Sequence, residues 1–414
     1  MQYGLIGEHL GHSFSREVHA RLGDYSYELR ELAPEAVDGF MRARDFYAIN
    51  VTIPYKETVI PYLDNIDEAA AAIGAVNTIR REGDRLLGFN TDFAGLGDLV
   101  RRTGVDLSGL SVLILGSGGT SKTAQAVCTA LGAREITVVS RRAENGAVSY
   151  EDAYARYSHV EFILNATPVG MYPAQDACPI ELDRFPHLRG VVDVIYNPLR
   201  TDLVLAARRR GIPAEGGLYM LVAQGVHASE IFMGTDIPPE KADEVFRSVQ
   251  CEKENIFLIG MPGSGKSTVG RALAEALDRP FLDTDDLIVQ HTGMPIPDIF
   301  KEKGEAGFRD IEEEVIREAA LHTRGAVIAT GGGAILREGN LHAMRRVGRI
   351  YFLDRELDYI KPTPDRPLSM DREALLSRYR ERYPLYCAAA DVILPPNEDL
   401  SARVQAIRKD FTEG

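Results

Sequence analysis

Short apolar runs alternate with segments of helical periodicity through the middle of the chain. Residues 111–115, 135–139, 162–166 and 191–195 are apolar runs of strand length, and residues 120–131 repeat apolar positions at helical spacing. Continuous apolar runs of this length are typical of strands that are buried on both faces of a sheet. Because these strands alternate with helices, the pattern predicts a parallel, doubly wound α/β sheet.

The segments on either side of this sheet also have α/β character. Before it, residues 3–6 and 48–53 predict buried strands and residues 67–73 predict a helix, which together indicate a first lobe. After it, three helices are predicted, at residues 201–210, 220–232 and 241–249. We expect the first two of these helices to pack back on the first lobe.

A polar break and a fresh apolar run indicate a second domain. Residues 251–254 are polar and precede an apolar run at residues 256–259. We therefore predict a first unit at residues 1–248, followed by a short linker. The predicted parts are a first lobe (about residues 1–95 and 220–248), the doubly wound domain (about 96–219), the linker (249–254) and a second α/β unit (255–414).

The charge of the chain limits the partners that it attracts. Its 414 residues carry a net charge of −14, and acidic side chains outnumber basic ones in both halves. Because neither half is basic, we expect no nucleic-acid or membrane partner. An anionic ligand must instead be bound by local amides, lysines and arginines.

The cysteines and the apolar runs bear on where the protein works. The cysteines stand singly at positions 128, 178, 251 and 387, without the spacing of a disulfide framework or a metal site. No apolar run is long enough to span a membrane, and the first residues lack a signal-peptide pattern. We expect a soluble, cytoplasmic protein, either a monomer or a homodimer.

Two glycine-rich loops, each placed after a predicted strand, carry the clearest chemical signal. The spacing of the first suits a dinucleotide pyrophosphate at a helix N-terminus. Its residues are Gly116, Ser117, Gly118, Gly119 and Thr120. The second has the pattern G-x-x-x-x-G-K-S over residues 260–267, and its expected nucleotide-binding residues are Gly263, Ser264, Gly265, Lys266, Ser267 and Thr268. There Lys266 would neutralise the phosphates of ATP and Ser267 would ligate Mg²⁺. One loop implies hydride transfer and the other implies phosphoryl transfer.

Four short motifs place polar side chains where strands or turns of the first lobe meet a cleft. They are His12-Ser13-Phe14-Ser15, Asn50-Val51-Thr52-Ile53-Pro54-Tyr55-Lys56, Gly74-Ala75-Val76-Asn77-Thr78 and Gly88-Phe89-Asn90-Thr91-Asp92. Taken singly, each motif has a structural interpretation as a helix cap, strand or turn. In this order, ahead of a dinucleotide loop, they resemble the shikimate dehydrogenase family over residues 3–232. The resemblance implies a substrate lobe, a Rossmann-type NADP-binding domain, and reduction of 3-dehydroshikimate to shikimate.

The resemblance also implies a role for each motif residue. Lys56 and Asp92 would form the catalytic pair, because a lysine oriented by a carboxylate can donate a hydrogen bond and a proton to a ketone oxygen. The implied substrate ligands are Ser13 and Ser15 at the carboxylate and Thr52, Asn77, Asp92 and Gln224 at the hydroxyls, with Tyr219 nearby. The implied cofactor contacts beyond the glycine loop are Ser140, Arg141 and Thr167. Residues 137–142 end in arginines where an NAD site usually carries an acidic residue, so NADP(H) is the expected cofactor.

A second set of motifs accompanies the second glycine loop. They are Leu282-Asp283-Thr284-Asp285, Gly307-Phe308-Arg309, Thr330-Gly331-Gly332-Gly333, Asp365-Arg366-Pro367-Leu368 and Arg382-Tyr383-Pro384-Leu385-Tyr386. The series resembles the shikimate kinase family over about residues 255–411. It implies a P-loop α/β domain with a parallel sheet that uses ATP and Mg²⁺ to phosphorylate shikimate.

The kinase resemblance assigns its residues in the same way. Asp285 would contact the acceptor hydroxyls and take the proton, and Asp283 would support Mg²⁺ through water. The implied substrate-binding residues are Arg309, Arg382, Gly331, Gly332 and Gly333. Arg366 would close on ATP from a lid at about residues 354–367, with Lys361 in place of a second arginine. We expect Asp286 to cap a helix that begins near Leu287, and residues 310–314 to be no more than the exposed face of a helix.

The two halves together predict a bifunctional enzyme, because the first makes the hydroxyl group that the second phosphorylates. One alternative is a ligand sensor that keeps both folds without catalysis, and the retained catalytic residues argue against it. Another is a dehydrogenase that prefers quinate, fused to a small-molecule kinase. The two serines at positions 13 and 15 favour shikimate over quinate.

Overall fold

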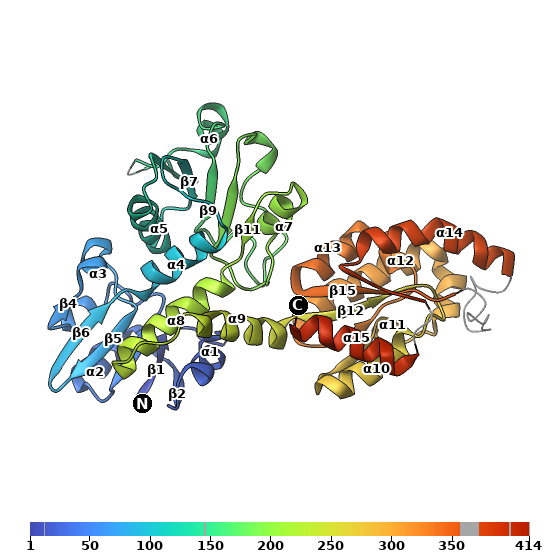
Figure 1. The fold of residues 1–414 in the computed structure, drawn as a ribbon, viewed down its shortest axis with the longest axis horizontal. Helices are drawn as coiled ribbons and strands as arrows, with labels where there is room; N and C mark the ends of the chain where they lie inside the picture. Colours follow the sequence, from blue (N-terminus) through green and yellow to red (C-terminus); the bar gives the residue numbers. More distant parts are fainter. Residues whose placement is uncertain (12, 145, 357–371, 397–398, 414) are drawn as a thin grey trace. The chain divides into compact units, whose positions relative to one another are not determined.

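The chain divides into two compact units, Met1–Val249 and Gln250–Gly414. The computed structural model describes every residue except 12, 145, 357–371, 397–398 and 414. Residues 249–254, which the sequence analysis assigns to a linker, are helical as far as Lys253, because α9 (Glu240–Lys253) runs through them. Each unit is α/β (Figure 1), which confirms the predicted fold class.

The first lobe of unit 1 is built on a six-stranded sheet with the order β2-β1-β3-β5-β6-β4. The strands are β1 (Tyr3–Gly7), β2 (Tyr27–Glu31), β3 (Ala48–Val51), β4 (Asn65–Ile66), β5 (Thr78–Glu82) and β6 (Arg85–Phe89). β1 pairs in parallel with β2 and β3, whereas β5 is antiparallel to both β3 and β6. The lobe is therefore a mixed sheet whose carboxyl end at β3 leads directly into the Thr52–Lys56 motif.

Helices cover this sheet and connect it to the rest of unit 1. They are α1 (Ser15–Leu22), α2 (Pro34–Ala43), α3 (Glu68–Ile73), α4 (Thr91–Arg102), α8 (Leu218–Met233) and α9, with a 3₁₀ turn at Ile60–Tyr62. α8 lies against α4 (Figure 1), and their approach is close. A Cβ on Gly95 of α4 would lie only 2.8 Å from the backbone nitrogen of Gln224 on α8. Glycine at position 95 thus allows the two helices to meet where Gln224 faces the start of α4.

The second part of unit 1 is a five-stranded parallel sheet with the order β11-β10-β9-β7-β8, as the sequence predicts. Its strands are β7 (Ser111–Leu115), β8 (Glu135–Val139), β9 (Phe162–Asn165), β10 (Gly190–Asp193) and β11 (Ala214–Glu215). Its helices are α5 (Gly119–Ala130), α6 (Tyr150–Arg156) and α7 (Asp202–Arg209), with a 3₁₀ turn at Leu182–Arg184. Val112 and Ile114 pack with α4 and α5, whereas Leu113 and Leu115 pack with α6 and α7. Alternate side chains of one strand therefore fill the two faces of a doubly wound sheet.

Unit 2 is a five-stranded parallel sheet with the order β13-β14-β12-β15-β16. Its strands are β12 (Asn255–Ile259), β13 (Phe281–Asp283), β14 (Val327–Ala329), β15 (Gly348–Leu353) and β16 (Val392–Leu394). Its helices are α10 (Lys266–Leu277), α11 (Thr284–Thr292), α12 (Ile296–His322), α13 (Glu338–Val347), α14 (Arg372–Ala389) and α15 (Leu400–Glu413), with a 3₁₀ turn at Ala334–Leu336. α12, α13 and α14 pack on one face of the sheet and α10 and α15 pack on the other (Figure 1). Among the described residues, no helix has the length and apolar character needed to cross a membrane.

Candidate active sites

Lys56 and Asp92 form an ion pair at the edge of the first lobe. Nζ of Lys56 donates to Oδ2 of Asp92 at 2.5 Å, and their side chains are 27% and 17% exposed. Asn90 caps α4, because its side chain accepts from the backbone nitrogen of Phe93 at 3.2 Å. Asp92 therefore lies in the first turn of α4 and is not needed as the cap, which leaves its carboxylate available to orient the lysine.

A buried polar network lies next to this pair. Oδ1 of Asn77 accepts from the backbone nitrogen of Thr91 at 2.8 Å, and Nδ2 of Asn77 donates to Oγ1 of Thr91 at 3.1 Å. The Thr91 hydroxyl donates in turn to Oε1 of Gln224 at 3.4 Å. Asn50 supports the network from β3 by donating to the Asn77 carbonyl oxygen at 3.3 Å. The structure thus brings the predicted residues Asn77, Asp92 and Gln224 to the N-terminal end of α4.

Two of the predicted serines lie together at the start of α1. The Ser13 hydroxyl donates to Oγ of Ser15 at 3.0 Å, and Ser15, the first residue of α1, is buried. Phe14 between them packs against the ring of Tyr196, with ring centroids 5.3 Å apart. His12 of the same motif lies outside the described residues. Thr52 directly follows β3, and its backbone nitrogen donates to the Ile6 carbonyl oxygen at 2.9 Å.

Tyr219, the tyrosine that the sequence analysis expects near the substrate, packs against the C-terminal residue of α4. The Arg102 guanidinium carbon lies 4.3 Å from the centroid of the Tyr219 ring, and the Phe246 ring packs edge-on against it with the centroids 5.4 Å apart. Arg102 is the last residue of α4, about 15 Å along the helix axis from Asp92 in its first turn. The tyrosine that packs beside the serine motif is Tyr196, a residue to which the sequence analysis gives no role.

The first glycine loop connects β7 to α5. Gly116 has φ of 104°, and a Cβ there would lie 3.0 Å from the carbonyl oxygen of Ala166, so the position requires glycine. Gly118 is the N-cap of α5, and Thr167 is held over the loop through Asn165. Oδ1 of Asn165 accepts from the Thr167 hydroxyl at 2.7 Å. This is the strand, tight turn and helix N-terminus that a dinucleotide pyrophosphate needs.

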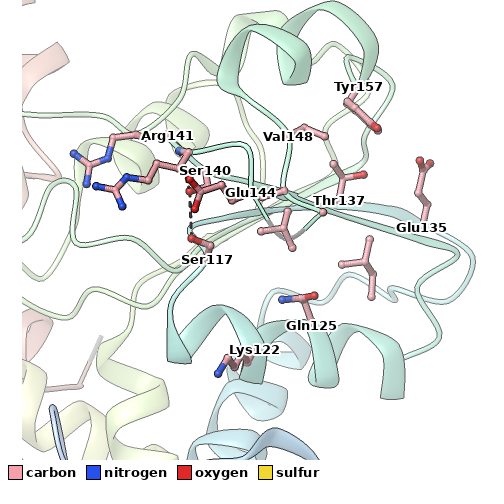
Figure 2. Close-up of a pocket in the computed structure, with 15 residues that line it drawn as sticks. Ser117, Lys122, Gln125, Glu135, Thr137, Ser140, Arg141, Glu144, Val148 and Tyr157 are labelled. Carbon is pink, nitrogen blue, oxygen red and sulfur yellow. Dashed lines mark hydrogen bonds between the residues drawn. The ribbon is translucent and has the colours of Figure 1, made fainter.

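A cavity of about 1230 Å³ opens beside this loop. Figure 2 shows Ser117, Ser140 and Arg141 at one end of it, with the two serine hydroxyls 3.2 Å apart. Arg142 and Glu144 also line the cavity. The arginines thus lie at the end of β8, the strand that meets the ribose in folds of this type.

The second glycine loop connects β12 to α10. Gly260, Gly263 and Gly265 all have positive φ, of 148°, 83° and 95°. Lys266 is buried at the start of α10, and its Nζ donates to the carbonyl oxygens of Gly260 and Met261 at 2.9 and 3.0 Å. The lysine side chain therefore folds back over the loop, where a triphosphate is bound in loops of this pattern.

Ser267 and Asp283 form the predicted pair next to the loop. The Ser267 hydroxyl donates to Oδ2 of Asp283 at 2.6 Å, and Oδ1 of Asp283 accepts from the backbone nitrogen of Asp285 at 3.1 Å. Asp283 is therefore the N-cap of α11, which begins at Thr284 rather than near Leu287. The expectation that Asp286 caps this helix is wrong, since its carboxylate is exposed and lies 3.8 Å from Arg271.

The remaining kinase motif residues line one cavity of about 750 Å³ together with the second glycine loop. They are Asp285, Arg309, Gly331, Gly332, Gly333 and Arg382. A Cβ on Gly333 would overlap the Arg309 guanidinium, and a Cβ on Gly331 would lie 3.1 Å from Oδ1 of Asp285. Arg382 donates to the Gly332 carbonyl oxygen at 3.1 Å. The glycines therefore leave room for side chains that converge on the acceptor end of the cavity.

Glu312 contradicts the expectation that residues 310–314 form only an exposed helix face. Its side chain is fully buried and accepts from Nη1 of Arg309 at 2.6 Å. Burial raises the pKa of Glu312, and the neighbouring Arg309 opposes the shift. Arg355 and Arg378 also line this cavity and were not singled out from the sequence. Lys361 and Arg366 of the expected lid lie outside the described residues.

The comparisons with known proteins agree with this geometry in both units. Residues 5–79 match the family model of the shikimate dehydrogenase substrate binding domain, and residues 262–411 match the model of shikimate kinase. A shikimate dehydrogenase (NADP(+)) from Clostridium perfringens is 34% identical over 266 residues, which cover 60% of this chain and 98% of that protein. The chain belongs to the shikimate dehydrogenase family.

Solved structures support the same assignment for the dehydrogenase-family unit. The shikimate 5-dehydrogenase of Thermus thermophilus, solved in complex with NADP(H) and shikimate, is 30% identical, with a TM-score of 0.54. The match covers 60% of this chain and 99% of that chain. A chorismate mutase/shikimate 5-dehydrogenase fusion protein from Clostridium acetobutylicum is 34% identical, with a TM-score of 0.57, over 60% of this chain and 96% of that one. A dehydrogenase unit of this family therefore also occurs fused to another enzyme.

Proposed function

We propose that the chain catalyses two successive reactions, the NADPH-dependent reduction of 3-dehydroshikimate to shikimate and the ATP-dependent phosphorylation of shikimate to shikimate 3-phosphate. The observation that carries the proposal is that each unit holds a separate and internally connected set of reactive groups. Lys56 and Asp92 are paired at 2.5 Å in unit 1, and the Ser267–Asp283 pair lies beside the buried Lys266 in unit 2. Both sets fall within family matches of the corresponding activity.

In unit 1, NADPH would supply a hydride to the carbonyl carbon of the substrate when it is bound. The chain must then stabilise and protonate the oxygen, and the Lys56 ammonium would donate that hydrogen bond and proton. Asp92 holds the ammonium in position through the 2.5 Å contact. We assign the hydroxyls of the substrate to Thr52, Asn77 and Gln224.

We further propose that Ser13 and Ser15 bind the substrate carboxylate, with Tyr196 rather than Tyr219 as the accompanying tyrosine. Tyr196 packs on Phe14, between the two serines, whereas Tyr219 packs on Arg102 at the far end of α4. On the cofactor side, Arg141 would pair with the 2′-phosphate of NADP(H), because no acidic residue takes the ribose-binding position at the end of β8.

In unit 2, Asp285 would accept the proton of the attacking hydroxyl, and Arg309 and Arg382 would bind the carboxylate of shikimate; all three line the cavity of the second glycine loop. Lys266 and the amides of the second glycine loop would neutralise the transferred phosphate. Ser267, and Asp283 through water, would hold a Mg²⁺ ion, because such ions are usually bound by one or two protein oxygens, substrate phosphates and water. Within the described residues, no group of three or more His, Cys, Asp or Glu side chains is arranged to hold a metal by itself. We also propose that Arg366 closes on ATP from the lid.

Two alternatives have less support. A ligand sensor without catalysis would not need the Lys56–Asp92 pair or the Ser267–Asp283 pair, and both are formed. A preference for quinate would require space for one more hydroxyl near the serine motif, where Phe14 and Tyr196 pack together. Four free thiols are consistent with our proposal that the enzyme works in the reducing cytoplasm.

The proposal is tested with the purified chain and single substrates. NADPH oxidation is followed after addition of 3-dehydroshikimate, and ADP release is followed after addition of shikimate and Mg-ATP. Quinate with NADP⁺ serves as the competing substrate. We expect both shikimate reactions and a much lower kcat/KM with quinate. Ligand binding without turnover in either unit would instead support the sensor.

A further inference from the structure

Arg355 follows the strand that lies beside the start of the second glycine loop. β15 pairs in parallel with β12, with Phe352 opposite Ile259. The carboxyl ends of the two strands therefore adjoin, and a Cβ on Gly260 would lie 2.7 Å from the carbonyl oxygen of Leu353. The chain that leaves β15 is thus in close contact with the chain that begins the glycine loop.

The backbone at Arg355 is fixed by buried groups. Asp354 is buried, and its Oδ1 accepts from the Arg355 backbone nitrogen at 2.8 Å and from the Tyr379 hydroxyl at 3.2 Å. Arg403, also buried, donates to the Asp354 carbonyl oxygen at 2.6 Å. Arg355 consequently projects from a backbone that these hydrogen bonds hold at the carboxyl end of β15.

The guanidinium of Arg355 lies over the glycine loop. Its Nη1 would be 3.6 Å from a Cβ built on Gly265, the residue directly before Lys266. It lines the same 750 Å³ cavity as Lys266 and Ser267. Among the described residues, this guanidinium has no hydrogen bond or ion pair, although it is partly buried. A cation that has no anionic partner in the described part of the chain is suited to an anionic ligand.

We propose that Arg355 binds phosphate oxygens of the nucleotide in the kinase cavity. The inference rests on the proposed kinase function and extends it. The sequence analysis expects Lys361 to take the place of a second arginine in the lid and gives Arg355 no role. Arginine suits this position since its planar fork can donate two parallel hydrogen bonds to one phosphate group. Its donors would add to the backbone amides of the loop and to Lys266 around the same polyphosphate.

The test compares the binding of ADP and adenosine to the full chain by calorimetry, without shikimate. Arg355→Gln should raise the Kd of ADP about tenfold or more, the loss expected for a charge-assisted hydrogen bond, and should leave the Kd of adenosine within twofold. Arg355→Lys should restore only part of the ADP affinity, because lysine keeps the charge without the fork. Arg317→Gln removes one exposed arginine of α12 and should bind both ligands as the unaltered chain does.

Three results would overturn the inference. Unchanged ADP affinity in Arg355→Gln would show that the guanidinium does not contact phosphate. Equal loss of ADP and adenosine affinity would place the contact at the base or ribose. Absence of ADP binding by the unaltered chain would remove the proposed kinase function, and the inference with it. Dehydrogenase turnover and the melting curve of each variant report that the chain is folded.

Discussion

Nζ of Lys56 and Oδ2 of Asp92 lie 2.5 Å apart, although 36 positions separate the residues in the chain. The contact depends on two local features: the turn after β3 that presents the lysine, and the Asn90 cap that frees Asp92. If this pair delivers the proton to the ketone oxygen, Lys56→Met should lower the rate of 3-dehydroshikimate reduction by about 10²- to 10⁴-fold. The rate is measured as NADPH oxidation at saturating substrate.

The control for Lys56→Met is Lys241→Met, which removes a lysine paired with Glu244 on α9. This variant should reduce 3-dehydroshikimate at the unaltered rate. Both variants should phosphorylate shikimate normally, since neither lysine belongs to unit 2. A Lys56→Met enzyme that keeps a tenth or more of the dehydrogenase rate would exclude Lys56 as the proton donor.

Arg141 provides a prediction about the cofactor. It lines the cavity beside Ser117 and Ser140, at the end of β8. Arg141→Ala should raise the KM for NADPH about tenfold or more, because a hydrogen bond between charged groups contributes roughly 1.5–3 kcal/mol. The KM for NADH should change little, as NADH has no 2′-phosphate. Parallel increases for the two cofactors would show that Arg141 acts elsewhere on the dinucleotide.

Removal of Arg309 from its buried ion pair with Glu312 should make the stability of the folded chain depend on pH. Arg309→Met leaves the fully buried Glu312 carboxylate without its partner, which typically costs about 3–5 kcal/mol. Burial already raises the pKa of Glu312, and loss of Arg309 should raise it further. A carboxyl group whose pKa is higher in the folded chain than in the unfolded chain contributes to the free energy of unfolding at low pH. This contribution is lost as pH rises from the unfolded-state pKa through the folded-state pKa. The loss of Tm in Arg309→Met should therefore be larger at pH 8 than at pH 5.

Arg337→Met is the matched control for this prediction. Arg337 pairs with Asp310 and Glu313 at the surface, and exposed pairs contribute at most about 1 kcal/mol. Its Tm should fall slightly and by a similar amount at both pH values. If Arg309→Met shows the same small and pH-independent change, the Glu312 carboxylate does not need Arg309 for burial.

Asp193 gives a second pH prediction, in unit 1. Burial raises its pKa to about 6, although it accepts from Asn165, Ile195 and Thr201. The folded chain thus binds this proton more tightly than the unfolded chain, so its contribution to stability should fall between about pH 4 and pH 6. At roughly 1.4 kcal/mol per pKa unit, the fall is about 3 kcal/mol.

The measurement for Asp193 is the free energy of unfolding by urea at several pH values, for the unaltered chain and for Asp193→Asn. The difference between the two isolates the contribution of this carboxyl group, since all other groups are shared. As pH rises from 4 to 6, the free energy of unfolding of the unaltered chain should fall relative to that of the variant. Above pH 6 the difference between the two should stay constant. A constant difference over this range would mean that Asp193 titrates normally.

Sequence patterns predicted the parallel sheet of unit 1 because its central strands β7, β9 and β10 are buried throughout, whereas the parallel sheet of unit 2 was implied by the kinase resemblance. All five residues of β7 are buried, and such strands are continuous apolar runs in the sequence. β5 and β6 gave no such signal, because β5 is buried only at its first two residues and then carries Arg80, Arg81 and Glu82. The mixed sheet of the first lobe therefore became visible only in the structure.

The candidate sites were predictable where a motif fixes the backbone. A strand, a glycine turn and a helix N-terminus place Gly116 and Lys266 without further information. Side-chain packing decides the remaining assignments. The family resemblance points to Tyr219 and not to Tyr196, and only their contacts with Arg102 and Phe14 distinguish the two tyrosines. Glu312 had one local signal, its spacing of three residues from Arg309 on a helix, which favours an ion pair.

The central claim, two successive reactions in one chain, is tested by a single incubation with 3-dehydroshikimate, NADPH and Mg-ATP, in which shikimate and shikimate 3-phosphate are quantified by mass spectrometry. The unaltered chain should convert the substrate to shikimate 3-phosphate. Lys266→Met should stop at shikimate, and Lys56→Met should form neither product yet phosphorylate added shikimate. Failure of the unaltered, folded chain to form shikimate 3-phosphate, or loss of both reactions in either variant, would contradict the account.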